Sequence, residues 1–178
     1  MTRARPDATE TASPDPAVDR LHALVGDLVS RGLTVATAES LTGGLLGALI
    51  TAVPGASATF RGGLIVYATD LKASLAHVDP ALLHAGGPVQ REVAVQLADG
   101  VRAACGAALG VGLTGVAGPD PVDGHAPGTW FVAVTGPDLT LTRHGTPSPG
   151  QVSPTRAEVR ADAVAAAVEL LELALAGP

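Results

Sequence analysis

The sequence has little cysteine, few aromatic residues and no cluster of basic residues. Its single cysteine, Cys105, excludes a disulfide framework and a zinc site built on paired thiolates. Only four aromatic residues are present, so the core must be built from Ala, Val and Leu. The net charge is −6, and binding to nucleic acid or to an anionic membrane requires clustered Lys and Arg. We therefore expect neither a nucleic-acid partner nor a membrane partner.

Long apolar runs are also absent. No segment approaches the roughly 18 apolar residues of a membrane span, and no apolar stretch marks a secretory signal. Residues 1–14 are polar and contain proline, which predicts a disordered leader. The remaining residues, 15–178, have the length and apolar content of a single domain. We expect a cytoplasmic protein. The five histidines show no paired spacing, so we expect no metal site and no cofactor.

Lysine is nearly absent. Ten of the eleven basic residues are arginines, and Lys72 is the only lysine. Arginine stays protonated, whereas lysine can lose its proton when it is desolvated and then act as a base. The exception therefore points to a specific role for Lys72, although a solvent-facing lysine beside Asp70 is an equally simple reading.

Short apolar segments alternate with helical patterns, which predicts an α/β fold. The five expected strands are 33–37, 63–68, 108–113, 129–135 and 139–143. The last two form a hairpin turned at 136–138. The expected helices are 16–31, 45–53, 69–76, 80–84, 90–105 and 155–176, and residues 145–154 form a Ser/Pro/Gly-rich loop that we expect to be mobile. This order predicts a mostly parallel mixed sheet of about five strands.

Three polar or glycine-rich segments follow the first three strands. They are ESLTGG after the first strand, YATDLK after the second and TGVAGP after the third. Ligands of α/β sheets bind at the carboxyl ends of the parallel strands. The sequence therefore predicts one site at which these three segments meet.

The segment ESLTGG can supply a nucleophile and backbone donors. Ser40 lies in a turn between strand and helix, and Gly43 and Gly44 let the backbone approach a ligand closely. The amides of Thr42 to Gly44 are candidate donors to a phosphate or an oxyanion. The alternative is that Ser40 or Thr42 simply caps the helix. The segment is not a GxSxG elbow, a GxGxxG fingerprint or a P-loop.

The other two segments supply further candidates. Tyr67 ends the second strand and precedes Lys72 by about one helical turn. Thr114 and Gly115 follow the third strand, where the Gly115 amide could face a ligand, although a plain tight turn explains the segment equally well. His125 lies in a Gly/Pro loop, where a solvated histidine is a simpler interpretation than a base.

Two arginines lie four residues apart near the start of the last helix. Arg156 and Arg160 can bind a phosphate together, or pair with Glu158 and Asp162 as ordinary surface charges.

In this order, the segments resemble the CinA C-terminal domain family, the nicotinamide mononucleotide (NMN) deamidases also called PncC. The resemblance runs from about Leu21 to Leu173. It rests on TAESLTGGLLGALITAVPGAS (37–57), GGLIVYATDLKASL (62–75), EVAVQLADGVRAACGA (92–107), LGVGLTGVAGPD (109–120), PGTWFVAV (127–134) and TRAEVRADAV (155–164).

This resemblance implies a three-layer α/β/α amidohydrolase domain that is often a homo-oligomer and uses no metal. It implies hydrolysis of the NMN carboxamide to nicotinate mononucleotide and ammonia. Ser40 matches the family's catalytic serine and Lys72 its lysine, and Tyr67, Thr114 and Arg156 match residues expected at the substrate. The alternatives are a non-catalytic nucleotide-binding module linked to competence or DNA damage, and an amidase for another small carboxamide.

The chain departs from the family pattern at four places. Leu41 replaces the cysteine that usually follows the serine, and 68–70 reads Ala-Thr-Asp where Ser-Asn-Glu is common. Residues 88–91 read Pro-Val-Gln-Arg in place of Ala-Val-Ser-Glu, and Pro-Thr replaces Gly-Asp before Arg156. These changes bear on the contacts to the ring and the phosphate more than on Ser40 and Lys72.

Overall fold

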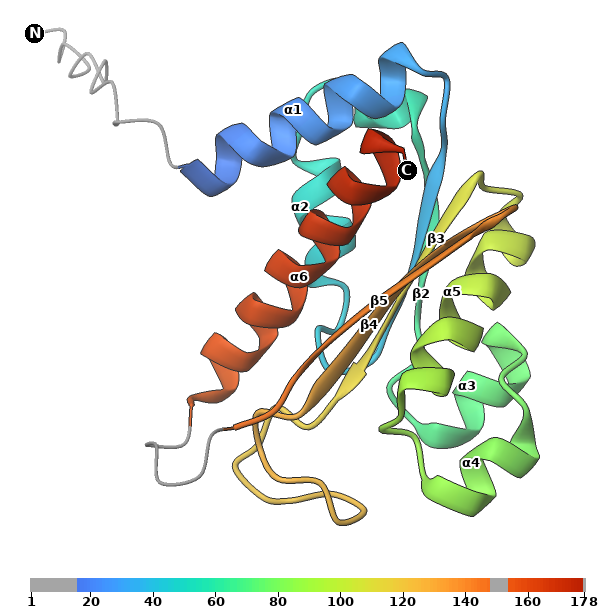
Figure 1. Ribbon diagram of the computed structural model, residues 1–178, viewed down its shortest axis with the longest axis vertical. Helices are drawn as coiled ribbons and strands as arrows, with labels where there is room; N and C mark the ends of the chain where they lie inside the picture. The colour runs from blue at the N-terminus through green and yellow to red at the C-terminus, as the bar shows by residue number, and fades with distance from the viewer. Residues whose placement is uncertain (1–15, 148–153, 178) are drawn as a thin grey trace, which may run out of the picture.

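The computed structural model describes residues 16–147 and 154–177 (Figure 1). The expected leader at 1–14 and most of the expected mobile loop at 145–154 lie outside these residues.

The centre of the molecule is a five-stranded mixed sheet. Its strands are β1 (Val35–Glu39), β2 (Phe60–Ile65), β3 (Leu109–Gly115), β4 (Trp130–Gly136) and β5 (Leu139–Gly145). The strand order is β2-β1-β3-β4-β5. Strand β1 pairs in parallel with β2 and with β3, and β3, β4 and β5 pair antiparallel. The expected parallel strands and the C-terminal hairpin are both present.

Helices cover both faces of this sheet. The helices are α1 (Pro16–Ser30), α2 (Leu45–Thr51), α3 (Thr69–Ala76), α4 (Pro80–Gly86), α5 (Arg91–Cys105) and α6 (Arg156–Ala176), with a short 3-10 turn η1 (Ala56–Ala58). Figure 1 shows α1, α2 and α6 on one face and α3, α4 and α5 on the other. The three-layer α/β/α architecture is therefore confirmed.

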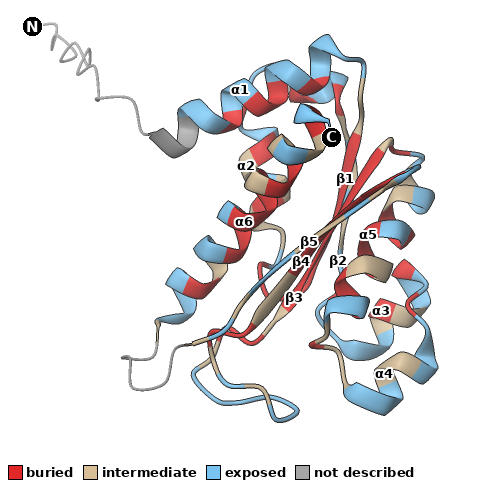
Figure 2. Cartoon of the chain, in the orientation of Figure 1, coloured by how far each residue is buried: buried red, intermediate tan, exposed pale blue. Residues whose placement is uncertain are grey.

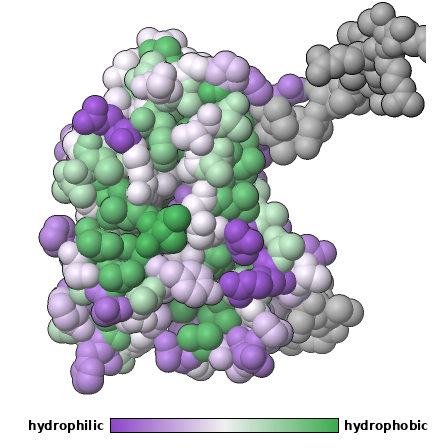
Figure 3. Space-filling model, turned by 180° about the vertical axis from the view of Figure 1, so that it is seen from behind, coloured by the Kyte–Doolittle hydropathy of each residue, from purple (hydrophilic) through white to green (hydrophobic). Residues whose placement is uncertain are grey.

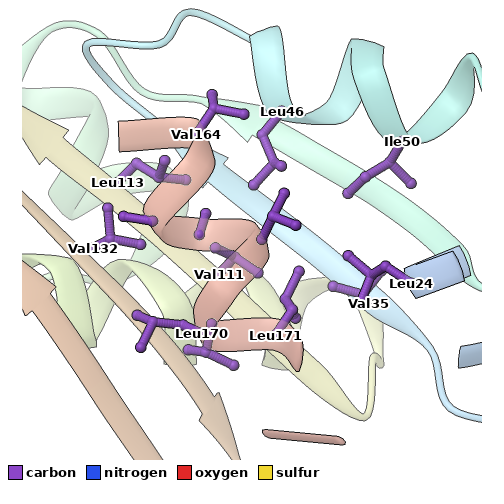
Figure 4. Packing of buried hydrophobic residues seen from close by; sticks show 14 of the residues in the cluster. Leu24, Val35, Leu46, Ile50, Val111, Leu113, Val132, Val164, Leu170 and Leu171 are labelled. Carbon is purple, nitrogen blue, oxygen red and sulfur yellow. The ribbon is translucent and has the colours of Figure 1, made fainter. Parts of the chain in front are cut away.

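The larger core lies between the sheet and the face that carries α1, α2 and α6. Figure 4 shows this packing, and its labelled side chains come from β1, β3, β4 and all three helices. Figure 2 shows buried residues along the sheet and in α1, α2, α5 and α6, whereas α4 has none. Aliphatic side chains fill this core, as the scarcity of aromatic residues requires.

On the other face of the sheet, glycine residues let α5 pack closely against β3. A Cβ at Gly110 would lie 2.0 Å from the Ala98 carbonyl oxygen of α5, and one at Gly112 would lie 2.1 Å from that of Ala94. Strand β3 therefore needs glycine at both positions, because any side chain would push α5 off the sheet.

Two strands are displaced from their expected positions. Strand β1 lies two residues later than expected, which places Glu39 at its end. Strand β2 begins at Phe60 instead of residue 63. The Gly62-Gly63 pair hides this strand from sequence reasoning, yet a Cβ at Gly63 would lie 2.6 Å from Thr37 Oγ1. Glycine is thus required there by the neighbouring strand.

Some large hydrophobic side chains stay at the surface. Figure 3 shows apolar residues gathered across the middle of the face opposite to the view of Figure 1. Ile65, at the end of the edge strand β2, is 57% exposed, and Tyr67 is 59% exposed. The expected homo-oligomer stays a prediction.

Candidate active site

Three strand ends meet at one edge of the sheet. Glu39, the last residue of β1, pairs in register with Ile65 of β2 and with Leu113 of β3. Because these strands are parallel, the segments that follow them leave the sheet on the same side. Ser40, Tyr67 and Gly115 are thereby brought to one place.

Ser40 and Lys72 are in hydrogen-bond contact. The Lys72 Nζ lies 3.1 Å from the Ser40 Oγ and also donates to the carbonyl oxygens of Val66, at 2.8 Å, and Tyr67, at 3.2 Å. Only 1% of Lys72 and 7% of Ser40 are exposed. The side chain that follows β2 therefore reaches the hydroxyl that follows β1, although 32 residues separate them.

Burial changes the acidity of Lys72. Desolvation disfavours the charged ammonium and lowers the pKa of Lys72 from 10.5 to about 8, while the negative charge of Asp70 opposes this shift. With a pKa of about 8, about a tenth of the molecules carry a neutral amine at pH 7. A neutral amine 3.1 Å from a hydroxyl can accept its proton.

Arg156 and Tyr67 lie together at the surface. The guanidinium of Arg156 donates through Nη2 to the Tyr67 hydroxyl at 2.9 Å and through Nη1 to the Gly118 carbonyl at 2.9 Å. Both acceptors are neutral. These two bonds therefore hold the guanidinium of Arg156 in place without neutralising its positive charge, which suits an anion-binding arginine.

A cavity of about 290 Å³ joins these groups. Its lining contains Ser40, Tyr67, Lys72, Thr114, Gly115 and Arg156 among the candidates from the sequence. The volume is close to the lower end of the range of small-molecule sites, about 300–1,000 Å³. The cavity thus presents a buried hydroxyl and amine on one side and a cation at its surface.

The model of the CinA C-terminal domain family matches residues 19–175. This chain belongs to that family. It is 47% identical over 162 residues to a CinA-like protein of Frankia casuarinae, covering 90% of this chain and 36% of that protein. It is 45% identical over 114 residues to a CinA-like protein of Acidobacterium capsulatum, covering 64% of this chain and 28% of that protein. The chain therefore spans roughly a third of the length of these curated relatives.

Solved structures agree with this assignment. The competence/damage inducible protein CihA from Agrobacterium tumefaciens has a TM-score of 0.83 at 30% identity, covering 94% of this chain and 99% of that one. A competence or damage-inducible protein from Enterobacter asburiae has a TM-score of 0.83 at 27% identity, with 91% and 99% covered. The sheet and helices described above are thus those of the CinA family.

In this CinA domain, the turn after Ser40 contributes less to the cavity than the sequence suggested. Thr42, Gly43 and Gly44 are outside its lining. The Gly44 amide donates to the Glu39 carboxylate at 3.0 Å, and the Gly43 amide donates to the Ser40 carbonyl at 3.1 Å. The glycines instead supply backbone conformation, since φ is 61° at Gly43 and 93° at Gly44.

The expectation that Ser40 or Thr42 caps the following helix is wrong. The N-cap of α2 is Gly44, which makes no side-chain cap. The buried Glu39 carboxylate takes that role, because it accepts from the amides of Gly44, Leu46 and Gly47. A carboxylate at a helix N-terminus also interacts favourably with the helix dipole. Ser40 is consequently left free of a capping role.

The two candidate threonines differ in their hydrogen bonding. Thr114 lines the cavity, but its Oγ1 donates to the Pro88 carbonyl at 2.7 Å. Across the described residues, no hydrogen-bond partner reaches the buried Thr42 Oγ1.

Sequence reasoning missed part of the cavity wall. Thr69, Pro88, Val89, Asp120 and Val122 also line it. Pro88 and Val89 lie in one of the segments that depart from the family pattern, and this departure is the sequence signal that could have indicated them. His125 is outside the lining. Within the described ranges, no group of three or more His, Cys, Asp or Glu side chains could hold a metal ion, and no helix is long and apolar enough to cross a membrane.

Proposed function

We propose that this chain hydrolyses the carboxamide of nicotinamide mononucleotide to nicotinate mononucleotide and ammonia. The observation that carries the proposal is the 3.1 Å contact between the Lys72 amine and the Ser40 hydroxyl in a cavity that ends at Arg156. Both side chains occupy the positions at which the sequence resembles the catalytic serine and lysine of the NMN deamidases.

In the first half of this reaction, the Ser40 Oγ attacks the carboxamide carbon. Its proton passes to the neutral Nζ of Lys72, so that a tetrahedral intermediate forms. The backbone amides of Leu41, directly after the nucleophile, and of Gly115 are the candidate donors to its oxyanion. Lys72 then gives the proton to the departing nitrogen, which leaves as ammonia, and an acyl ester remains on Ser40.

The second half of the reaction hydrolyses the acyl ester on Ser40. A water molecule attacks the acyl carbon and loses a proton to Lys72. Collapse of this intermediate breaks the ester bond, and the proton returns to the Ser40 Oγ as nicotinate mononucleotide leaves. The lowered pKa of Lys72, about 8, supports both proton transfers, because a base near neutrality can accept and return a proton.

Arg156 is the candidate for the phosphate end of the substrate. Its guanidinium is oriented by Tyr67 and Gly118, and neither partner carries a negative charge. A phosphate dianion could therefore pair with this arginine through charge-assisted hydrogen bonds.

The decisive experiment measures ammonia release from NMN and follows the product by mass spectrometry. We expect turnover by the wild-type chain and none by Ser40→Ala or Lys72→Met. Full turnover by Lys72→Met would refute the mechanism. NMN binding without turnover would indicate the non-catalytic binding module, and faster turnover of nicotinamide or nicotinamide riboside would indicate an amidase for another carboxamide.

A further inference from the structure

The second arginine of α6 points to the turn that carries Ser40. The Arg160 Nη2 donates to the Thr42 carbonyl oxygen at 2.7 Å. Throughout the part of the chain that the structure describes, Arg160 forms no ion pair with Glu158 or Asp162. Glu158 instead forms a capping box with Thr155. The charge of Arg160 is therefore directed at the backbone of this turn.

This turn is intrinsically easy to deform. It contains Gly43 and Gly44, both with positive φ, and glycine is the residue with the greatest backbone freedom. Its two ends are fixed, since the Ser40 amide donates to the Leu113 carbonyl and the Gly44 amide to Glu39. The Thr42 carbonyl lies between these ends and accepts from the Leu45 amide at 3.3 Å, and Arg160 adds a shorter, charge-assisted hydrogen bond at 2.7 Å.

We propose that Arg160 is a positioning residue for the hydrolysis. It holds the Ser40 turn against α6, and thereby keeps the Ser40 hydroxyl within reach of Lys72. Arg160 itself is outside the cavity lining, so it acts through the turn and not on the substrate. The inference rests on the proposed function, because it assigns a role in that same site.

The spacing of the two arginines gives this role a structural basis. Residues four apart lie on the same face of a helix. Arg156 contacts the segments after β2 and β3, through Tyr67 and Gly118, while Arg160 contacts the segment after β1. The first two turns of α6 (the orange end of this helix in Figure 1) thus connect all three strand ends that form the site. Arg156 is thus directed toward the ligand, and Arg160 toward the turn that carries the nucleophile.

Steady-state kinetics on NMN separate these roles. We expect Arg160→Met to lower kcat about 10- to 100-fold, because a displacement of about 1 Å in a reacting group costs up to about that factor. The KM should change less than about threefold, since Arg160 does not touch the substrate. Arg160→Lys keeps a cationic donor and should recover part of the rate. A rise in KM with an unchanged kcat would overturn the positioning role.

The matched control is Arg20→Met. Arg20 of α1 binds Glu172 near the other end of α6 through two hydrogen bonds, at 2.7 and 2.6 Å. Its loss weakens the attachment of α6 without touching the Ser40 turn, so kcat should stay at the wild-type value. An equal fall of kcat in Arg20→Met and Arg160→Met would show a general effect of helix attachment and refute the specific role.

A second measurement is independent of the substrate. A fluorophosphonate probe reacts with an activated serine, in which the Ser40 Oγ displaces fluoride from phosphorus and its proton passes to Lys72. We expect the labelling rate at Ser40, followed by mass spectrometry, to fall about tenfold in Arg160→Met and to stay unchanged in Arg20→Met.

The labelling results also separate the two proposals. Labelling of the wild type at Ser40 without ammonia release from NMN would refute the proposed substrate, while slower labelling of Arg160→Met would still support the positioning role. Equal labelling of the wild type and Arg160→Met, or no labelling of the wild type at Ser40, would overturn that role. Arg160→Lys gives the same comparison if Arg160→Met does not fold.

Discussion

Replacing Lys72 by methionine should change stability in a way that depends on pH. Lys72 is almost fully buried, and desolvation lowers its pKa from 10.5 to about 8. Below pH 8 the folded protein must therefore keep an ammonium that its surroundings disfavour. Methionine has a similar shape and no charge, so the variant removes this cost together with the hydrogen bonds of the amine.

The size of the effect follows from the structure. A fall in pKa from 10.5 to about 8 is equivalent to about 3 kcal/mol that disfavours the folded state while Lys72 is charged in both states. Loss of the bonds to Ser40, Val66 and Tyr67 costs about 1 kcal/mol each. At pH 7 the two effects nearly cancel, so the variant should be about as stable as the wild type.

The variant should become the less stable of the two proteins at higher pH. The unfolded chain binds more protons at position 72 than the folded chain between pH 8 and 10.5, so the wild type gains stability as the pH rises through this range. Above it, the variant should be about 3 kcal/mol less stable, because only the cost of the three lost hydrogen bonds remains.

Urea unfolding from about pH 7 to about pH 10 measures this difference. Other titrating groups are shared by both proteins and cancel in the comparison. Ser40→Ala is the matched control, since it removes the hydroxyl and retains the buried amine, and it should follow the pH dependence of the wild type. A difference between Lys72→Met and wild type that stays constant with pH would refute the reasoning.

Three further predictions concern the same site. The kcat/KM for NMN should rise with pH and level off above about pH 8, because the neutral form of Lys72 is the base; a flat profile of ammonia release would contradict this. Glu39→Gln should lower the free energy of unfolding by about 1–3 kcal/mol, because the charged cap of α2 is lost, and an unchanged thermal midpoint would argue against that cap. Tyr67→Phe removes a hydroxyl that orients Arg156, so KM should rise severalfold at a nearly constant kcat; a fall in kcat alone would instead place Tyr67 in the chemistry.

The sheet edge that carries the site could be predicted because its signals are local. Apolar segments followed by polar turns mark the strand ends, and parallel strands bring those ends together whatever their exact boundaries. This is why the expected meeting of Ser40, Tyr67 and Lys72 holds although β1 and β2 lie two or three residues from their expected positions. The single lysine of the chain added an independent signal.

The roles within the Ser40 turn could not be predicted in the same way. Glu39, Ser40 and Thr42 are adjacent polar residues, and each type can cap a helix. The choice depends on which side chain turns toward α2, and this is set by the register of β1. Since β1 extends to Glu39, that carboxylate faces the helix and Ser40 is left to face Lys72.

The hydrogen-bond partner of Arg160 could not be predicted from the sequence either. On the sequence, Glu158 and Asp162 are its nearest carboxylates, whereas the Thr42 carbonyl is 118 residues away. Both carboxylates are only two residues away, a spacing that does not place them beside Arg160 on a helix, and exposed ion pairs contribute only about 0–1 kcal/mol. The structure offers the carbonyl of the buried Thr42 instead, and a hydrogen bond from a charged group contributes about 1.5–3 kcal/mol.

The chain thus uses its two kinds of basic residue for different physical reasons. Arg156 and Arg160 bind carbonyl and hydroxyl oxygens, for which a guanidinium that stays protonated is suited at any pH. Lys72 lies where desolvation penalises a charge, and only a side chain that can release its proton relieves that penalty. An arginine at position 72 would remain charged and could not accept the proton of Ser40. The same burial that weakens the fold at neutral pH therefore supplies the base that the proposed hydrolysis requires.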